Sequence, residues 1–368
     1  MNNGERPGLP APRRDVALMA GYHSPQLAVD VRLNTNEAPE PPPAAFVAAL
    51  QEELGRLAWN RYPDRSARAL RVALAAHHGV TPEEVFCANG SNEVLQSLLL
   101  AYGGPGRNVV VFEPTYALHS HIARVTGTRV VTGARDEEFL LDSDEVGRCL
   151  AEARAQDLDG PNPVITFLCS PNNPTGRLEP DARVDDLCRR APGLVVIDEA
   201  YGQFAPRSAL WRRGENERVV IVRTFSKTWS LAGLRLGYAL GAPEVVEAME
   251  RVVLPYHLDL VTQAAGVLAL AHEEEMRARV ARLVVERGRV VAGLEGLGCA
   301  VVPSDANFVL FAPDGRDAHA IWSALVEQSV LVRDVSGWPR LAGYLRVTIG
   351  APAENDRFLE ALGAALGR

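Results

Sequence analysis

Cysteine is scarce in this sequence, and its few cysteines form no pattern. The 368 residues include five, which are widely spaced, odd in number and without a C-x-x-C pair: Cys87, Cys149, Cys169, Cys188 and Cys299. A disulfide framework or a zinc site would need paired or closely spaced cysteines. The pattern therefore predicts no disulfide framework and no metal site, and it favours reduced thiols that are mostly buried as small hydrophobic side chains.

Long apolar runs and runs of like charge are also missing. No apolar stretch approaches the roughly 18 to 20 residues that span a bilayer, and residues 1–15 lack an apolar core of the signal-peptide type. The net charge is −8, from 38 basic and 46 acidic side chains scattered along the chain. Such a surface does not attract nucleic acid or anionic lipid. We expect a cytoplasmic protein that binds neither nucleic acid nor membrane.

The sequence does contain short apolar runs that alternate with helical segments, which is typical of an α/β fold with a largely parallel sheet. Buried strands are predicted at residues 109–112, 164–169, 194–197 and 219–222. Helices are predicted at residues 44–57, 66–78, 92–101, 116–126, 144–156 and 181–190.

The pattern changes after Pro255. A long helical region is predicted at 262–297, then strands near 306–311, 330–333 and 344–348, and a final helix from Glu354. Because 368 residues exceed what one core usually holds, we predict an N-terminal arm, a large domain and a smaller α+β domain. The predicted limits are 1–43, 44–255 and 256–368.

Polar residues follow the predicted strand 219–222. They are Thr224, Ser226 and Lys227, with Arg235 further along the chain. A lone lysine would mean little, because most lysines are solvated surface residues. Two hydroxyls, an amine and a guanidinium at a strand end, however, can bind a phosphate and place an amine beside an aldehyde, as imine formation requires.

Two other strand ends carry polar residues. Asp198, with Tyr201 three residues later, follows the strand 194–197. Its carboxylate could keep a pyridine nitrogen protonated, or it could simply cap a helix. Asn173 lies in the turn 170–176, which proline and glycine make rigid. Its amide could donate to a phenolic oxygen, or the segment could be only a well-made turn.

Two further positions also have two interpretations. Ser91 and Asn92 open a predicted helix, where free backbone N–H groups form either a phosphate site or an ordinary N-cap. Tyr116 is either a core aromatic residue or a ring that stacks on a planar cofactor.

These segments and their order resemble the fold-type-I pyridoxal-phosphate aminotransferases, and among them most closely the histidinol-phosphate aminotransferase family. The resemblance covers nearly the whole chain. It is carried by residues 32–37, 61–64, 90–93, 170–176, 198–201, 223–238, 306–308, 332–334 and 345–348. It implies an aspartate-aminotransferase-like fold and pyridoxal 5'-phosphate as the cofactor.

The resemblance also implies a role for each matched residue. Lys227 would carry the cofactor as an imine, Asp198 would pair with its pyridine nitrogen, Asn173 and Tyr201 would bond its phenolate oxygen, and Tyr116 would stack on its ring. Its phosphate would be held by Ser91, Asn92, Thr224, Ser226 and Arg235, with Tyr62 reaching in from a second subunit of a homodimer whose arm packs on the small domain and the partner.

On the substrate side, Arg346 matches the arginine that binds the α-carboxylate, and Arg333 matches a residue at the distal end of the substrate, including its phosphate. Ordinary surface arginines are the alternative for both. Asn36 and Tyr22 lie in arm segments that match substrate-binding positions.

The implied activity is a ping-pong transamination from an amino donor to a 2-oxo acid, with Lys227 as both anchor and general acid–base. The expected donor is histidinol phosphate, with 2-oxoglutarate as acceptor. Ala38 departs from the family pattern, and the segment 21–25 matches it only loosely, both where substrate is recognised. An aromatic or specialised amino-acid aminotransferase, a pyridoxal-phosphate decarboxylase and a non-catalytic relative therefore stay open.

Overall fold

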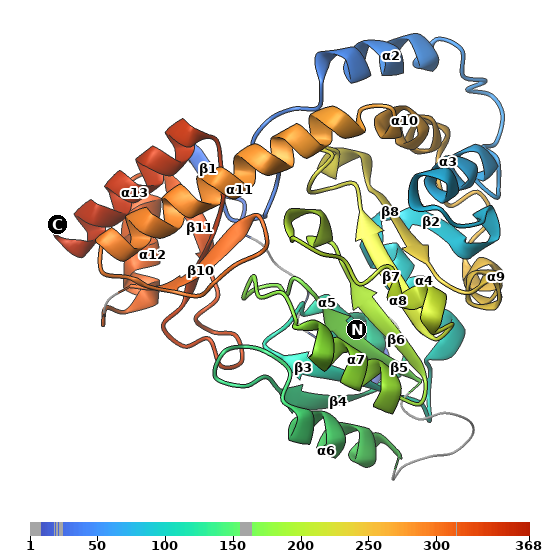
Figure 1. Cartoon of the computed structure of the whole chain (residues 1–368), viewed down its shortest axis with the longest axis horizontal. Coiled ribbons are helices and arrows are strands. Elements are labelled where there is room, and N and C mark those ends of the chain that lie inside the picture. The colour runs from blue at the N-terminus through green and yellow to red at the C-terminus, as the bar shows by residue number, and fades with distance from the viewer. Residues whose placement is uncertain (1–8, 18, 20, 22–24, 155–163, 314) are drawn as a thin grey trace, which may run out of the picture.

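A seven-stranded sheet forms the centre of the larger part of the molecule (Figure 1). The computed structural model describes residues 9–17, 19, 21, 25–154, 164–313 and 315–368. In the order β2-β8-β7-β6-β5-β3-β4, the strands of this sheet are β2 (Val85–Asn89), β8 (Leu236–Leu240), β7 (Val219–Thr224), β6 (Leu194–Asp198), β5 (Ile165–Cys169), β3 (Asn108–Glu113) and β4 (Arg129–Ala134). Neighbours from β7 to β4 are parallel, whereas β8 is antiparallel to both β7 and β2.

Helices cover both faces of this sheet, because its strands are apolar on both sides. On β7, for example, Val220 and Val222 face one core and Val219 and Ile221 the other. The first core is closed by α4 (Gly90–Tyr102), α5 (Leu118–Val125) and α9 (Pro243–Val252). The second is closed mainly by α2 (Ala44–Leu54), α3 (Arg68–His78), α6 (Ser143–Arg154), α7 (Asp181–Arg190) and α10 (Leu260–Leu270). Two short helices are α1 (Arg14–Ala17) and α8 (Arg212–Glu215).

A second, five-stranded sheet forms the smaller part, on the left in Figure 1. Its strands, in the order β1-β11-β12-β10-β9, are β1 (Val31–Leu33), β11 (Val330–Asp334), β12 (Leu345–Thr348), β10 (Phe308–Ala312) and β9 (Ala300–Val301). The helices beside it are α11 (Glu273–Gly296), α12 (Ala318–Glu327) and α13 (Pro352–Leu366). The arm enters this sheet, since β1 pairs in parallel with β11.

The predicted fold class is confirmed: a mostly parallel sheet with helices on both faces and a smaller α+β part. The domain limits at residues 43 and 255 stay predictions. The predicted long helix at 262–297 is two helices, because the chain turns at Ala271 and His272, whose N–H groups bond Leu268 and Ala269. No glycine or proline marks that turn in the sequence. The strands and α-helices that were not predicted are β1, β2, β4, β8, β9, α1, α8, α9 and α12.

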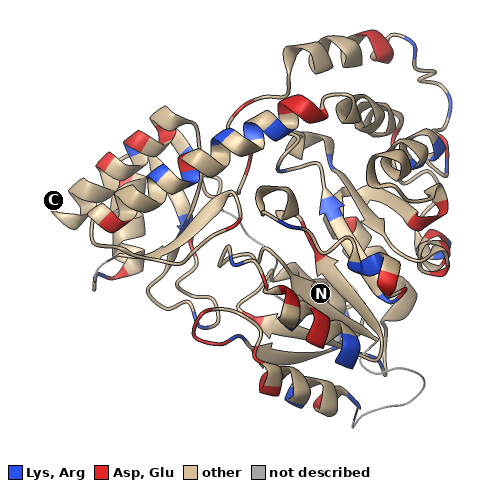
Figure 2. Ribbon diagram, viewed as in Figure 1, with Lys and Arg blue, Asp and Glu red and all other residues tan. Residues whose placement is uncertain are grey.

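Charges of both signs are interspersed along the helices (Figure 2). The helix α11 begins with Glu273–Glu275 and continues with arginines such as Arg277 and Arg289, which pair with glutamates of the same helix. Among the described residues, no helix is both long and apolar enough to cross a bilayer.

Candidate active site

One cavity of about 360 Å³ gathers most of the predicted site residues. It lies between the carboxyl ends of β5, β6 and β7, the start of α4, the strands β11 and β12 of the smaller sheet, and the arm. The predicted residues that line it are Asn36, Ser91, Asn92, Tyr116, Asn173, Asp198, Tyr201, Thr224, Ser226, Lys227, Arg235, Arg333 and Arg346. The cavity also contacts residues that the sequence did not single out, among them Thr35, Glu37 and Trp338.

At one end of the cavity, polar groups form a cup suited to an anion. Ser91 and Asn92 stand in the first turn of α4, where unpaired N–H groups and the helix dipole favour negative charge. From the opposite side, the hydroxyls of Thr224 and Ser226 bond each other at 2.9 Å, and the Arg235 guanidinium lies 3.4 Å from the Ser226 hydroxyl. These contacts hold the polar groups at and after the end of β7 together.

Two glycines make this close approach possible. Gly90 has φ +79°, and a Cβ atom there would lie 2.6 Å from Nη2 of Arg235. A Cβ atom on Gly237 of β8 would lie 2.2 Å from the backbone nitrogen of Ser91. A larger residue at Gly237 would therefore push the strand away from the helix terminus, and one at Gly90 would displace the Arg235 guanidinium from the cup.

Asp198 is almost fully buried at the end of β6. Its Oδ1 accepts a hydrogen bond from the Ala200 N–H at 3.0 Å, so this oxygen caps a turn and not a helix, since the next helical turn begins at Gly202. Its Oδ2 lies 3.1 Å from Nε2 of His119. His119 is buried and stacks on Phe167, with ring centroids 4.7 Å apart. Sequence reasoning missed His119, because nothing local shows that this face of α5 reaches the end of β6.

Asn173 and Tyr201 are tied to the arm and to the smaller sheet. The Tyr201 hydroxyl accepts a hydrogen bond from Nδ2 of Asn36 at 2.9 Å, and Oδ1 of Asn173 accepts one from Arg346. The amide nitrogen is therefore the group that Asn173 can offer to a ligand. Burial raises the pKa of the Tyr201 phenol, so the hydroxyl keeps its proton at neutral pH.

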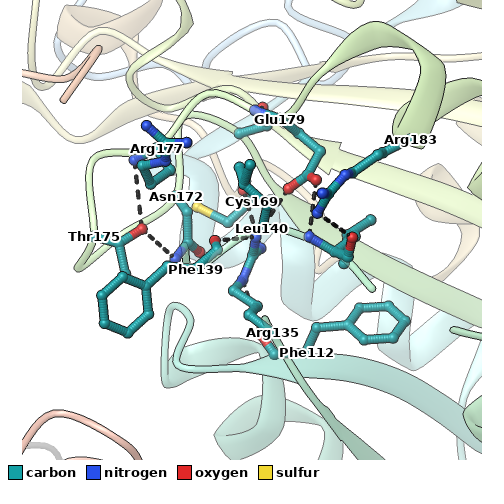
Figure 3. Close-up of polar contacts among 12 residues, drawn as sticks. Phe112, Arg135, Phe139, Leu140, Cys169, Asn172, Thr175, Arg177, Glu179 and Arg183 are labelled. Carbon is teal, nitrogen blue, oxygen red and sulfur yellow. Dashed lines mark hydrogen bonds and ion pairs between the residues drawn. The ribbon is translucent and has the colours of Figure 1, made fainter. Parts of the chain in front are cut away.

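A buried ion pair anchors the turn that carries Asn173 (Figure 3). Arg135 and Glu179 pair at 3.0 Å with side chains only 1% exposed. Arg135 also donates to the carbonyl of Phe139, and Glu179 accepts from the Leu141 N–H at 2.9 Å. The N–H of Glu179 in turn donates to the Ser170 hydroxyl at 3.0 Å. The turn is thus held by charged groups whose bonds are satisfied inside the protein.

Lys227 reaches into the middle of the cavity. Its Nζ donates to the carbonyl of Thr35 in the arm at 3.0 Å. Burial, with the nearby Arg346 guanidinium, lowers the pKa of Lys227 to about 8, although the Glu37 carboxylate acts in the opposite direction. Near physiological pH the neutral amine, which a nucleophile or general base requires, is therefore far more abundant than on an ordinary lysine, although the protonated form still predominates. Lys227 is also the single lysine in the 368-residue sequence.

Two arginines face the other end of the cavity. Arg333 and Arg346 are direct partners in the antiparallel pairing of β11 with β12, and both are buried. Their side chains therefore leave the same face of the sheet, and like charges directly opposite each other are unfavourable unless an anion joins them. Arg346 donates to the Asn34 carbonyl at 2.9 Å, and its Cζ lies 5.1 Å from the ring centre of Phe308.

Asn36 fastens the arm over this end. Its N–H donates to the Thr348 hydroxyl at 3.0 Å, and its carbonyl accepts a bond from Asn307 at 3.2 Å. Its φ of +56° is one that asparagine tolerates better than most residues. These partners lie far from Asn36 in the sequence, so only the folded chain brings them together.

Among the described residues, one predicted site residue, Tyr62, does not line the cavity. Tyr62 is 80% exposed and stacks on Tyr256, with ring centroids 4.5 Å apart. Tyr22 lies outside the described residues. That Tyr62 serves a second subunit, and that Tyr22 contacts substrate, stay predictions.

Known proteins with similar sequences and structures are aminotransferases. Residues 28–362 match the family model described as aminotransferase class I and II. The chain is 45% identical over 350 residues to the histidinol-phosphate aminotransferase of Corynebacterium glutamicum, covering 92% of each chain. The enzyme of that name from Thermobifida fusca is also 45% identical, over 365 residues, with 97% of this chain and 95% of the relative covered.

A solved structure with the same architecture is histidinol-phosphate aminotransferase from Sinorhizobium meliloti in complex with pyridoxal-5'-phosphate. The TM-score is 0.87 at 25% identity, and 98% of this chain and 99% of that chain are covered. The resemblance inferred from the sequence motifs is thereby confirmed, and the chain belongs to the class I and II aminotransferases.

Proposed function

We propose that this protein is a pyridoxal-phosphate-dependent histidinol-phosphate aminotransferase, which passes the amino group of histidinol phosphate to 2-oxoglutarate in histidine biosynthesis. The observation that carries the proposal is a single cavity that holds Lys227 together with two buried arginines, Arg333 and Arg346. The two relatives at 45% identity, which carry this name, support the same activity.

The residues of the cavity fit pyridoxal phosphate. The cup beside Gly90 suits the phosphate dianion, and a Cβ atom at Gly90 would intrude on it. The Asp198 carboxylate would hold the pyridine nitrogen, while Asn173 and Tyr201 would bond the phenolate oxygen. Tyr116, whose hydroxyl donates to Asn92 at 3.0 Å, would lie against the ring.

The protein's own groups then have defined tasks. When bound, pyridoxal phosphate supplies an aldehyde that takes the amino group and a ring that withdraws electrons from the carbon that bore it. The neutral amine of Lys227 accepts a proton from that carbon on its Nζ atom, and in the reverse half of the cycle it gives a proton back to that carbon. Asp198, held by the Ala200 N–H and by His119, keeps a negative charge in place without a further change of geometry.

The arginine pair suits both substrates. Histidinol phosphate carries one phosphate monoester of charge about −1.5 to −2 at neutral pH, and 2-oxoglutarate carries two carboxylates. Guanidinium groups bind phosphate and carboxylate equally well through paired N–H donors. Because Arg333 and Arg346 are cross-strand partners, both can reach one phosphate, or each can take one carboxylate.

The proposal is tested by comparing two amino donors. Holoenzyme is assayed with histidinol phosphate and with phenylalanine, each against 2-oxoglutarate. Phenylalanine has a single carboxylate and so makes fewer charged hydrogen bonds to the arginine pair, and a hydrogen bond to a charged group contributes about 1.5 to 3 kcal/mol. We therefore expect kcat/KM to favour histidinol phosphate by about 10- to 150-fold.

Other results would replace the proposal. Turnover of phenylalanine without turnover of histidinol phosphate would establish the aromatic alternative. Release of carbon dioxide without amino transfer would establish the decarboxylase.

We also propose that the enzyme is a homodimer in which Tyr62 serves the neighbouring active site. Tyr62 stacks on the exposed Tyr256, and two residues close to them in the sequence, Trp59 and Leu254, are also exposed, by 65% and 78%. Large apolar side chains left on a surface in this way are typical of protein–protein contacts. A second copy of the chain would cover the surface and carry the Tyr62 hydroxyl to a cavity that is not its own.

Mixed dimers test this arrangement. Lys227→Ala and Tyr62→Ala homodimers, each impaired, are unfolded together, refolded and assayed. If Tyr62 acts in trans, the mixed dimer contains one site with both native residues, and activity returns. If Tyr62 acts within its own chain, every site lacks one of the two, so mixing restores nothing and the proposal fails.

We further propose that the enzyme works in the cytoplasm. Each of the five cysteines is buried and free of a disulfide, which suits a reducing compartment. Fractionation of cells that express the chain would check the location, and recovery of the protein outside the cytoplasmic fraction would contradict it.

A further inference from the structure

We propose that Trp338 is a specificity-determining residue, whose ring aligns the Arg333 guanidinium so that the enzyme selects substrates carrying a second negative charge. The inference rests on the proposed function, because it assigns the part of the substrate that Arg333 meets. Trp338 lines the same cavity as Lys227 and was not singled out by the sequence.

Each of the two buried arginines lies over an aromatic ring. The Cζ atom of Arg333 is 5.5 Å from the ring centre of Trp338, and that of Arg346 is 5.1 Å from the ring centre of Phe308. A guanidinium over a ring face is held by cation–π attraction, while its N–H donors stay available at its edges. The rings therefore orient two sets of donors toward one cavity.

The two rings differ in origin. Phe308 belongs to β10, inside the small sheet, and is fully buried. Trp338 belongs to the segment that joins β11 to β12, so its position depends on what holds that segment. Its N–H bonds the carbonyl of Val335 at 2.9 Å, and its ring packs against an apolar cluster that includes Leu341 and, from the other part of the molecule, Phe139.

Polar contacts of Arg340 also fix this segment to the loop that follows β4 of the large sheet. Arg340 pairs with Glu137 at 2.9 Å and also donates to the carbonyl of Arg135. Arg135 is itself held by the buried pair with Glu179 (Figure 3). Trp338 therefore forms one wall of the cavity, in a segment held between the end of β11 and the loop that follows β4.

The Trp338 ring matters for substrates that carry two negative charges and not for those that carry one. A donor with one anionic group is satisfied by Arg346, whose donors are already directed by Asn34 and Asn173. A phosphate dianion or a dicarboxylate also needs Arg333 in a defined orientation. Loss of the Trp338 ring should therefore weaken binding of dianionic substrates and leave the proton transfer at Lys227 unchanged.

The experiment uses holoenzyme with Trp338→Leu, Trp338→Phe and a matched control, Trp322→Leu. Trp322 donates to the carbonyl of Val332 at 3.0 Å, beside Arg333 on β11, but it does not line the cavity. The measured quantities are KM and kcat for histidinol phosphate and 2-oxoglutarate, the inhibition constant of inorganic phosphate, and the phenylalanine half-reaction followed by cofactor absorbance.

We expect Trp338→Leu to raise both KM values and the inhibition constant by about 3- to 30-fold, the range of a partly desolvated cation–π contact. The value of kcat and the affinity for phenylalanine should hardly change. The ring of Trp338→Phe should restore most of the lost affinity. Trp322→Leu should lower the melting temperature without raising either KM.

Three results would each overturn the role of Trp338. The first is that Trp338→Leu leaves both KM values and the inhibition constant unchanged. The others are that Trp338→Leu weakens the binding of phenylalanine equally, or that Trp322→Leu raises KM equally. If the native enzyme fails to use histidinol phosphate, it is the proposed function that fails. The constants for 2-oxoglutarate and inorganic phosphate still decide the role of Trp338 in that case.

Discussion

The cavity end that holds the anion cup comes from the carboxyl ends of neighbouring parallel strands, whereas the end that holds the two arginines comes from antiparallel strands of the other sheet. At the first end, Asp198, Thr224 and Ser226 each lie at or within two residues of the end of a buried strand. At the second, Arg333 and Arg346 lie within strands and meet through cross-strand pairing.

This difference separates the chemistry from the selection of substrate. At the first end, the large sheet holds the polar groups in place, and these groups bond largely to one another and to the adjacent backbone. The second end depends on the arm, on β11 and on β12 together, as the bonds from Arg346 to Asn34 and Asn173 show. Substitutions at the two ends should therefore fail in different ways.

The largest effect is expected from Lys227→Ala, which should abolish the chemical step and spare the cup. General acid–base catalysis alone contributes about 10²- to 10⁴-fold, and the variant also loses the covalent anchor, so kcat should fall by at least about 10³-fold. The cofactor should still bind without a covalent bond, as measured by absorbance after dialysis.

The single lysine makes this prediction unusually sharp. Borohydride reduction of native holoenzyme should attach the cofactor to the peptide that contains Lys227, as mass spectrometry can show, and the variant should acquire no label on any side-chain amine. Turnover of the variant within tenfold of the native rate would refute the assignment and remove the contrast between the two ends.

A smaller effect is expected from Arg346→Lys at the substrate end. A lysine keeps the charge, but its compact ammonium group cannot donate hydrogen bonds to Asn34, Asn173 and a substrate anion at the same time. Loss of one or two charged hydrogen bonds, at about 1.5 kcal/mol or more each, corresponds to roughly a 10- to 150-fold fall in kcat/KM for either substrate.

Arg357→Lys provides the control for this substitution. Arg357 lies on α13 at the surface, away from the cavity, so its replacement should leave kcat/KM unchanged. If Arg346→Lys instead released the cofactor and left KM unchanged, the two ends would not be separable in the way proposed here.

The smallest effect is a shift in pH dependence. Only neutral Lys227 attacks an aldehyde, so attachment of the cofactor to apoenzyme should speed up as pH rises through the lowered pKa of about 8 and level off above it. Glu37 raises the pKa of Lys227, so Glu37→Gln should move the midpoint to lower pH, by less than about one unit because that carboxylate is half exposed.

Arg346 acts on the same pKa with the opposite sign, so Arg346→Gln should move the midpoint to higher pH. Stopped-flow absorbance over a pH series measures both shifts. Shifts in the same direction would show that solvent access, and not the charge of the substrate end, sets the basicity of Lys227.

Much of the first end could be predicted from the sequence because its signals are local. A buried parallel strand is a short apolar run, and polar residues directly after it must lie at the edge of the sheet where ligands bind. Asp198 after β6 and Thr224 at the end of β7 follow this rule. The helix limits were also nearly right, as at α3 and α7, because the helical periodicity, Gly79 after α3 and Pro180 before α7 are local signals too.

Contacts between distant segments were not predictable in this way. His119 reaches Asp198 across 79 positions, and Asn36 reaches Thr348 across 312. No periodicity or turn signal encodes such a meeting, because it depends on how α5 and the arm pack after the sheets have formed. The break between α10 and α11 was missed for a related reason, since the apolar pattern continues through it.

The sequence by itself determined which residue can form an imine with a cofactor, because Lys227 is the one lysine side chain in the chain. It also determined that hydroxyls and a carboxylate would gather around that lysine, since each follows a recognisable strand. Only the tertiary structure decided that Arg333 would stand opposite Arg346 and over Trp338. That arrangement depends on the register of β11 with β12, and a shift of one residue would turn each side chain to the other face of the sheet.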